Sequence, residues 1–242
     1  MTARLMTGKK IAIIPARGGS RRIPRKNIKL FAGKPIIAWS IETAIKSNCF
    51  DKVIVSTDDE EIASVARSYG AETPFIRPKE LSDHFTGTNA VVKHAIEWFE
   101  ENNKTISLAC CIYATAPFVQ KKFLQKALEA IETNDIYFSY SVTSFPFPIQ
   151  RAIRINKLNR AEAIWPENIS KRSQDLEETY QDAGQFYWGT AKAFLENIPI
   201  FAPTSIPVVL PRYFVQDIDT PEDWIRAEIM FKALVETGEI QV

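Results

Sequence analysis

The stretch that decides the fold reads Ile11-Ala-Ile-Ile-Pro-Ala-Arg17-Gly-Gly-Ser20-Arg21-Arg-Ile-Pro-Arg-Lys26-Asn27-Ile-Lys29. Its first four residues form an apolar run of the kind found in buried parallel strands. The residues that follow form a loop with two glycines and six basic side chains. Because open α/β sheets bind ligands at the carboxyl ends of their strands, this loop suits a polyphosphate.

The basic residues of the chain are concentrated before its first acidic residue, Glu42, which ten lysines and arginines precede. The whole chain has 30 basic and 29 acidic residues, so the part from Glu42 onward is strongly acidic. A short basic segment on an acidic chain disfavours nucleic-acid binding. No aromatic residue lies between Arg17 and Leu30, so the segment offers no platform on which bases could stack.

The composition is that of a chain with a full hydrophobic core. With 242 residues, 45% of them hydrophobic, it can form a single domain over residues 1–242. No apolar run approaches about 18 residues, the length of a membrane-spanning helix, and no N-terminal apolar stretch has the length of a signal peptide. The cysteines Cys49, Cys110 and Cys111 form no CxxC pair, and we interpret them as buried thiols of a cytoplasmic protein.

Strand-like and helix-like patterns alternate over the first 140 residues and predict an α/β fold with a Rossmann-like, mostly parallel sheet. Short apolar runs predict the strands, and apolar residues every three or four positions predict the helices. The expected strands span residues 11–14, 53–55, 73–76, 108–113, 208–210 and 214–216. The expected helices run from Pro35 through Ile45, from a cap at Asp58 or Asp59 to Gly70, and over residues 89–101, 120–133 and 221–236.

This alternation breaks at residues 143–182, which we interpret as a small excursion from the main sheet. It opens with Ser144-Phe-Pro-Phe-Pro148, whose prolines exclude a central strand. Residues 151–155 and 161–165 flank a turn-like segment and predict a hairpin. The pattern alone leaves two alternatives, a subunit interface that also covers the substrate or a simple surface flap.

The loop after the first strand has the chemistry of an anion site but fits neither the P-loop nor the GxGxxG pattern. Its glycines let the backbone approach an anion closely. Arg17 and Arg21 can grip phosphate oxygens with forked guanidinium groups, while Lys26 acts as a point charge. The alternative is a solvated basic turn without a ligand.

The segment Pro15-Ala-Arg-Gly-Gly-Ser-Arg-Arg-Ile-Pro-Arg-Lys-Asn27 resembles the N-terminal signature of cytidylyltransferases that activate nine-carbon α-keto-acid sugars, a family with the fold of the nucleotide-diphospho-sugar transferases. Arg17, Ser20, Lys26 and Asn27 match that signature, whereas Arg21 stands where the family often has lysine. Three later segments resemble further motifs of the family: Arg77-Pro-Lys-Glu-Leu81, His94-Ala-Ile-Glu97 and Val215-Gln-Asp-Ile-Asp-Thr220.

Two departures from the family pattern bear on the sugar. In Ile112-Tyr-Ala-Thr-Ala-Pro117 a tyrosine, Tyr113, replaces glutamine, and in Ala183-Gly-Gln-Phe-Tyr187 the residue Gln185 replaces alanine. Both segments are similar to the branch that acts on pseudaminic acid. The resemblance therefore implies transfer of CMP to pseudaminic acid, with CMP-sialic, CMP-legionaminic and CMP-octulosonate synthesis as alternatives. A catalytically silent nucleotide-binding module is the alternative of a different class.

The resemblance also implies roles for the basic loop. The substrates would be CTP and a nonulosonic acid, and the sugar hydroxyl would attack the α-phosphorus and expel pyrophosphate. Arg17, Ser20 and Arg21 would hold the β- and γ-phosphates, and Lys26 would meet the charge that grows on the α-phosphate. Asn27 would fix the loop and reach toward the nucleotide.

The segment that resembles the family's metal motif contains Asp217 and Asp219, whose alternation on an extended segment lets both side chains point the same way. Two carboxylates suit Mg²⁺, which also takes phosphate oxygens. The resemblance implies that Arg17, Lys26 and Asp219 are the catalytic residues. From the pattern alone, Asp219 could instead be a loop residue before a helix that Thr220 caps.

For the pyrimidine, the resemblance implies a site formed by Arg77, Thr86 and Thr88, although Arg77 could equally be a structural ion-pair partner. His94 has apolar neighbours in its predicted helix, which favours a packed core histidine over a catalytic base. His84 is expected to be an ordinary loop residue.

The sugar site implied by the resemblance draws on two parts of the chain. Its candidate residues are Tyr113, Thr115, Arg172, Gln185 and Tyr187. A tyrosine can cover an apolar ring face and still offer its hydroxyl. Lys171 or Arg172 would supply a cation for the sugar carboxylate across the interface of a homodimer.

Overall fold

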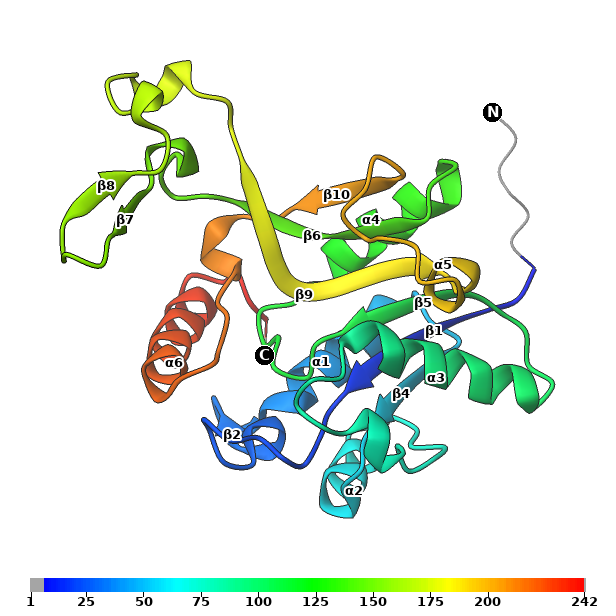
Figure 1. Ribbon diagram of the computed structural model, residues 1–242. Helices are drawn as coiled ribbons and strands as arrows, with labels where there is room; N and C mark the ends of the chain where they lie inside the picture. The colour runs from blue at the N-terminus through cyan, green and yellow to red at the C-terminus, as the bar shows by residue number, and fades with distance from the viewer. Residues whose placement is uncertain (1–6, 242) are drawn as a thin grey trace.

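The protein is built around one six-stranded sheet, shown in Figure 1, which draws the computed structural model. The structure describes residues 7–241. The strand order is β10-β6-β9-β5-β1-β4, and every strand except β9 runs in the same direction. The strands are β1 (Lys9–Pro15), β4 (Lys52–Ser56), β5 (Ile106–Ile112), β6 (Phe138–Ser144), β9 (Tyr180–Thr190) and β10 (Ser205–Val209). The predicted α/β fold with a mostly parallel sheet is therefore confirmed.

Helices cover both faces of the sheet because the side chains of each strand point alternately to opposite faces. In β1, Ala12 and Ile14 belong to one apolar cluster, and Ile11 and Ile13 belong to the other. The first cluster packs against α1 (Ile36–Ser47), α2 (Glu60–Ser68) and α4 (Lys121–Thr133). The second packs against α3 (Thr88–Glu101) and α5 (Ala191–Leu195).

A third apolar cluster holds the last helix, α6 (Pro221–Glu236), against the segment that follows the basic loop. That segment contains the short strands β2 (Leu30–Phe31) and β3 (Lys34–Pro35). The ring of Phe31 contacts Phe231 edge-on, with centroids 5.4 Å apart. A capping box between Thr220 and Asp223 begins α6. The segment just before this helix contacts the basic loop through Asp219.

Most predicted elements are present, but two predicted strands are wrong. Residues 73–76 form no strand, and the neighbouring Glu72 makes only a single bridge to Ile54. Pro74 lacks the backbone donor that a strand there would need. Phe214 ends a 3₁₀ turn, Arg212–Phe214, and is buried in the third cluster, and residues 215–216 are irregular. Strands β6 and β9 were not predicted.

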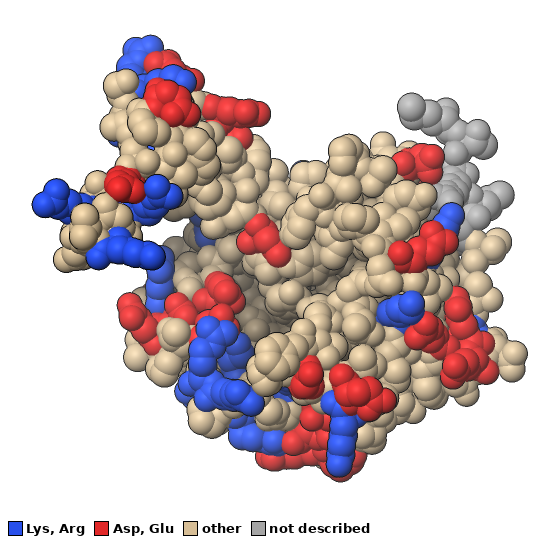
Figure 2. Space-filling view, viewed as in Figure 1, with Lys and Arg blue, Asp and Glu red and all other residues tan. Residues whose placement is uncertain are grey.

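The excursion is an arm of residues 145–179, because the ends of the predicted range, 143–144 and 180–182, belong to β6 and β9. The predicted hairpin is confirmed as β7 (Ile153–Ile155) paired with β8 (Ala161–Ala163). Figure 1 shows the arm projecting from the ends of β6 and β9, and Figure 2 shows a hollow on this face between the arm and the rest of the molecule.

The single domain over residues 1–242 stays a prediction, and residues 1–6 and 242 lie outside the described part of the chain. Over residues 7–241, no helix combines the length and the apolar character needed to cross a membrane.

Candidate active site

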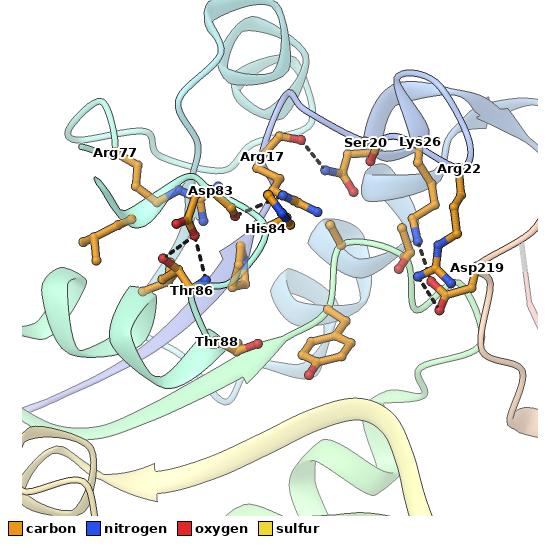
Figure 3. Close-up of a pocket in the computed structure, with 17 residues that line it drawn as sticks. Arg17, Ser20, Arg22, Lys26, Arg77, Asp83, His84, Thr86, Thr88 and Asp219 are labelled. Atoms are coloured by element: carbon orange, nitrogen blue, oxygen red, sulfur yellow. Dashed lines mark hydrogen bonds and ion pairs between the residues drawn. The ribbon is translucent and has the colours of Figure 1, made fainter. Parts of the chain in front are cut away.

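A cleft of about 280 Å³ opens at the carboxyl ends of β1, β4 and β5. These strands are parallel, so the residues that follow them meet at one edge of the sheet. The cleft is lined by predicted site residues from four parts of the chain: Arg17, Ser20, Lys26, Asn27, Arg77, Thr86, Thr88, Tyr113, Thr115 and Asp219. Figure 3 shows Lys26, Arg22 and Asp219 at one end of the cleft and Arg77, Asp83 and Thr86 at the other.

The basic loop is fixed against the start of α2 by acidic side chains. The backbone N–H of Gly18 donates to Asp58 Oδ1 at 2.9 Å. Arg25 donates to both carboxylate oxygens of Asp59, at 2.6 and 2.9 Å. A Cβ atom on Gly18 would lie 2.7 Å from Asp59 Oδ2, so only glycine fits there. Arg25 therefore anchors the loop, and it is not among the residues that line the cleft.

The Arg25–Asp59 pair gives stability a defined pH dependence. Arg25 lowers the pKa of Asp59 from 3.8 to about 2. Because the folded-state pKa is depressed, the stabilisation is complete above the ordinary pKa and is lost as the pH falls from about 4 to about 2. Since both side chains keep contact with solvent, we expect about 1 kcal/mol rather than the full value of the shift.

We expect Asp59→Asn to lower the free energy of unfolding at pH 7 by about this amount, because asparagine keeps the helix cap but loses the charge. Urea unfolding of wild type and variant at several pH values measures the difference, which should vanish near pH 2. Glu129→Gln, at an exposed carboxylate, is the control. A difference that stays constant with pH would contradict the assignment.

Lys26 and Asp219, nearly two hundred residues apart in sequence, meet at one end of the cleft. Lys26 Nζ donates to the carbonyl oxygen of Ile218 at 2.7 Å and lies 3.4 Å from Asp219 Oδ1. Arg22 Nη2 lies 2.7 Å from Asp219 Oδ2. Arg22 was not singled out from the sequence, although it belongs to the same basic run. Arg21 was singled out from the sequence, but it is exposed and does not line the cleft.

Asp217 lies two residues before Asp219, outside the lining of the cleft. Partial desolvation and the negative charge of Asp219 raise the pKa of Asp217. Two carboxylates that repel each other in this way are relieved by a shared cation. Among residues 7–241, no group of three or more histidine, cysteine or acidic side chains could hold a metal, so a cation at these aspartates would need ligands from phosphate.

The other end of the cleft has a buried guanidinium group. Arg77 is only 4% exposed, and burial lowers the pKa of its side chain. Its Nε donates to Ser82 Oγ at 3.2 Å, while Nη2 has no hydrogen-bond partner and lies 3.8 Å from Asp58 Oδ1. A buried donor without a partner is costly, which suits a carbonyl acceptor supplied by a ligand.

The turn at Thr86 is organised by Asp83, which sequence reasoning missed. Asp83 Oδ1 accepts from both the backbone N–H and the hydroxyl of Thr86, each at 2.7 Å. The Asp83 carbonyl accepts from Arg17 Nη1 at 3.0 Å. His84, expected to be an ordinary loop residue, lines the cleft.

Two further residues make structural contacts. Asn27 is buried and donates to the carbonyl of Arg17 at 2.9 Å, the loop contact expected of it. His94 contacts Phe75 edge-on at 4.8 Å and its Nδ1 is buried without a partner. Burial lowers the pKa of His94, so this side chain packs as expected.

The candidate sugar residues are only partly brought together. Tyr113 and Thr115 line the cleft, and Tyr187 is buried beside Tyr113 with ring centroids 5.5 Å apart. Gln185, predicted to face the sugar, is instead buried and donates to the carbonyl of Phe214 at 2.5 Å. Arg172 lies on the arm, where it is exposed and pairs with Asp175.

The chain is similar to known cytidylyltransferases. The family model described as "Cytidylyltransferase" matches residues 11–227. The chain is 49% identical to the pseudaminic acid cytidylyltransferase of Campylobacter jejuni, over 93% of this chain and 97% of that protein. It is 32% identical to the CMP-N,N'-diacetyllegionaminic acid synthase of Legionella pneumophila, over 90% of this chain and 94% of that protein.

Among solved structures, a CMP:2-keto-3-deoxy-manno-octonic acid synthetase complexed with CTP matches with a TM-score of 0.68. It is 16% identical to the chain and the match covers 93% of this chain and 99% of that one. At this identity the similarity establishes the fold alone.

Proposed function

Because the chain belongs to the cytidylyltransferase family, we propose that it transfers CMP from CTP to the C2 hydroxyl of pseudaminic acid and releases pyrophosphate. The observation that carries the proposal is the similarity, over nearly the full length of both chains, to a protein named for that sugar. Proteins named for legionaminic and sialic acids are less similar, so these sugars are the alternatives to test.

In this reaction the sugar oxygen forms a bond to the α-phosphorus, the bond from that phosphorus to the bridging oxygen breaks, and the hydroxyl proton is released. Such transfers depend mostly on positioning and charge neutralisation. Arg17 and Ser20, which line the cleft, would hold the β- and γ-phosphates, and Arg22 would contribute from the end at Asp219. Lys26 would stabilise the charge on the α-phosphate.

We further propose that Asp217 and Asp219 hold Mg²⁺ together with the triphosphate. Their fit to a cation is supported by the raised pKa of Asp217, to which the charge of Asp219 contributes. Magnesium is commonly held by one or two carboxylates and substrate phosphates. When bound, it would neutralise phosphate charge and lower the pKa of the attacking hydroxyl.

The nucleobase would occupy the end of the cleft at Arg77. The unpartnered Nη2 of Arg77 can donate to the cytosine carbonyl. The turn through Thr86 and the start of α3 at Thr88 would contact the rest of the base. For the sugar, Tyr113 and Thr115 are the accessible candidates, and Tyr187 supports Tyr113 from behind.

We propose that the arm is the interface of a homodimer, which would place Arg172 of one subunit near the sugar site of the other. Phe147, Ile155 and Leu158 are at least 71% exposed, and exposed apolar groups of this size typically mark an interface. Analytical ultracentrifugation should show a dimer for the wild type and a monomer for Leu158→Asp. A monomeric wild type would contradict the proposal.

We place the reaction in the cytoplasm. The three cysteines are free and buried, which is typical of a reducing compartment. Fractionation of the native host, followed by detection of the protein, tests this placement.

The decisive experiment measures pyrophosphate release from CTP with a panel of keto-acid sugars. We expect release with pseudaminic acid to exceed release with legionaminic, sialic and octulosonic acids, and competition of all four for one CTP pool should yield mainly CMP-pseudaminic acid. Release with another sugar would correct the substrate. CTP binding without release for any sugar would favour a silent nucleotide-binding module.

A further inference from the structure

We propose that Arg25 is a positioning residue for the reaction, which holds the backbone at Lys26 so that the lysine ammonium group meets the α-phosphate. This inference rests on the proposed function, since it concerns the same cleft. Arg25 directly precedes Lys26 in the basic loop but does not itself line the cleft. Its backbone adopts a conformation that is rare for arginine.

Arg25 occupies a turn position that glycine usually takes. The backbone N–H of Lys26 donates to the carbonyl of Ile23 at 3.2 Å, which closes a turn with Pro24 and Arg25 at its centre. Arg25 has a φ of +54°, in the left-handed region. In turns with proline second and a positive φ third, the third residue is normally glycine or asparagine. A longer side chain is strained there, so its presence needs a compensating contact.

The side chain of Arg25 supplies that contact at the start of α2. Its guanidinium group donates to both oxygens of Asp59, at 2.6 and 2.9 Å, and to Glu61 at 2.5 Å. Asp59 is itself fixed, because its Oδ1 caps α2 by accepting from the N–H of Ile62 at 3.0 Å. Ile62 is buried in the first apolar cluster. Arg25 therefore ties the turn to a rigid part of the fold, which a glycine could not do.

The same contacts make Arg25 unsuited to binding phosphate. Its positive charge faces the carboxylates of Asp59 and Glu61, whereas Arg17 and Lys26 line the cleft. Arg25 therefore serves the geometry of the loop, and its cationic neighbours serve the charge of the nucleotide.

The turn sets the point from which the side chain of Lys26 extends. The carbonyl of Arg25 accepts from the N–H groups of Ile28 and Lys29, each at 3.0 Å, and so begins a 3₁₀ turn whose first residue is Lys26. At the far end of this side chain, the ammonium group donates to the carbonyl of Ile218 at 2.7 Å. Lys26 is therefore held at both its backbone and its ammonium group.

The hold on the backbone matters more once the nucleotide is bound. A phosphate would draw the ammonium group of Lys26 away from Asp219, whose Oδ1 lies 3.4 Å from it. The position of the ammonium group would then depend on where the backbone of Lys26 is fixed. A loosened turn would let Lys26 miss the α-phosphate, and a displacement of about 1 Å can cost about 10²-fold in rate.

Arg25→Gly is the main test because it removes the side chain and lets the turn keep its shape without strain. We expect kcat to fall about 10- to 100-fold, whereas KM for CTP should change by less than about threefold. KM should change little because Arg17 is held separately, by its own bond to the carbonyl of Asp83 and by the bond from Gly18 to Asp58.

A double-mutant cycle with Lys26 distinguishes positioning from a general loss of structure. If Arg25 acts through Lys26, Arg25→Gly in the Lys26→Ala background should change kcat by less than about twofold. Arg25→Ala keeps the strain, so it should unfold at a lower urea concentration than Arg25→Gly while losing a similar factor in kcat. Wild-type kcat in Arg25→Gly, or the same loss in the Lys26→Ala background as in wild type, would overturn the inference.

Arg67→Ala is the matched control. Arg67 also pairs with an acidic residue at the start of α2, Glu60, but its other contact is with Thr73, at 2.7 Å, outside the basic loop. The kcat and both KM values of Arg67→Ala should equal those of the wild type. Equal losses of kcat in Arg67→Ala and Arg25→Gly would contradict the proposal, because they would assign the effect to charge near α2 rather than to the turn.

NMR of the ligand-free protein with ¹³Cε-labelled lysine separates this inference from the proposed function. The Lys26 resonance is identified by its loss in Lys26→Ala. In Arg25→Gly it should move toward the resonances of exposed lysines, because the ammonium group is no longer held in one place. If it does not move, Arg25 does not position Lys26, whatever the substrate. If it moves but the wild type turns over no sugar, the proposed function fails and the positioning role stands.

Discussion

Replacing Asp219 with alanine is expected to reduce kcat by about 10³-fold or more, which corresponds to the several kcal/mol that metal-assisted charge neutralisation supplies. Asp219 is where Arg22, Lys26 and the proposed Mg²⁺ site converge. Its ion pairs are partly exposed, so their loss should change stability by less than about 1 kcal/mol. Steady-state kinetics at saturating CTP and sugar measure the effect, and circular dichroism checks that the fold survives.

Glu222→Gln is the control for Asp219→Ala, because Glu222 is an exposed carboxylate three residues later that does not line the cleft. Electron paramagnetic resonance with Mn²⁺ and CTP adds a readout other than turnover, and Asp219→Ala should bind the ion more weakly. A variant with the wild-type rate and wild-type Mn²⁺ binding would remove the metal assignment.

Lys26→Ala is expected to reduce kcat by about 10²–10³-fold, the range typical for loss of a group that stabilises developing charge. The ammonium group of Lys26 is held by the carbonyl of Ile218, 2.7 Å away, so it is positioned before the nucleotide arrives. KM for CTP should change less than kcat if Lys26 acts mainly on the transition state.

Lys29→Ala removes the same charge from the same loop and serves as the matched control. Lys29 lies over the ring of Trp224, 4.5 Å from its centroid, and does not line the cleft. The Lys29→Ala variant should lose about 0.5–1 kcal/mol of stability and keep the wild-type kcat. Equal kinetic losses in both variants would show that the loop acts only through its overall charge.

Helices and strands could be predicted where their signals lie within a few neighbouring residues of the sequence. The buried run of β1 and the capped start of α6 both carry their signals within a few residues, and both were placed correctly. Strand β9 was missed because its first residues are polar and exposed while its last ones are buried, so no single alternation runs along it. Its antiparallel direction depends on neighbours that are distant in sequence.

The site residues likewise differ in whether local sequence was enough to predict them. Arg17 and Lys26 sit on one continuous loop, and the sequence was sufficient to place them. Gln185 was assigned to the sugar through the family resemblance, because it stands where the family has alanine. In the structure the amide of Gln185 instead donates to the carbonyl of Phe214, a contact between distant segments that no local pattern reveals. Arg22 could not be told apart from its basic neighbours without the position of Asp219.

The contacts of Asp219 link the binding of the nucleotide to the binding of the divalent ion. In the free protein its two oxygens are already neutralised by side chains from the basic loop. The phosphates of a bound nucleotide would pair with Arg22 and Lys26. The carboxylate of Asp219 would then be free to bind a divalent ion. Nucleotide and ion would thus bind cooperatively, each raising the affinity of the other by the same factor.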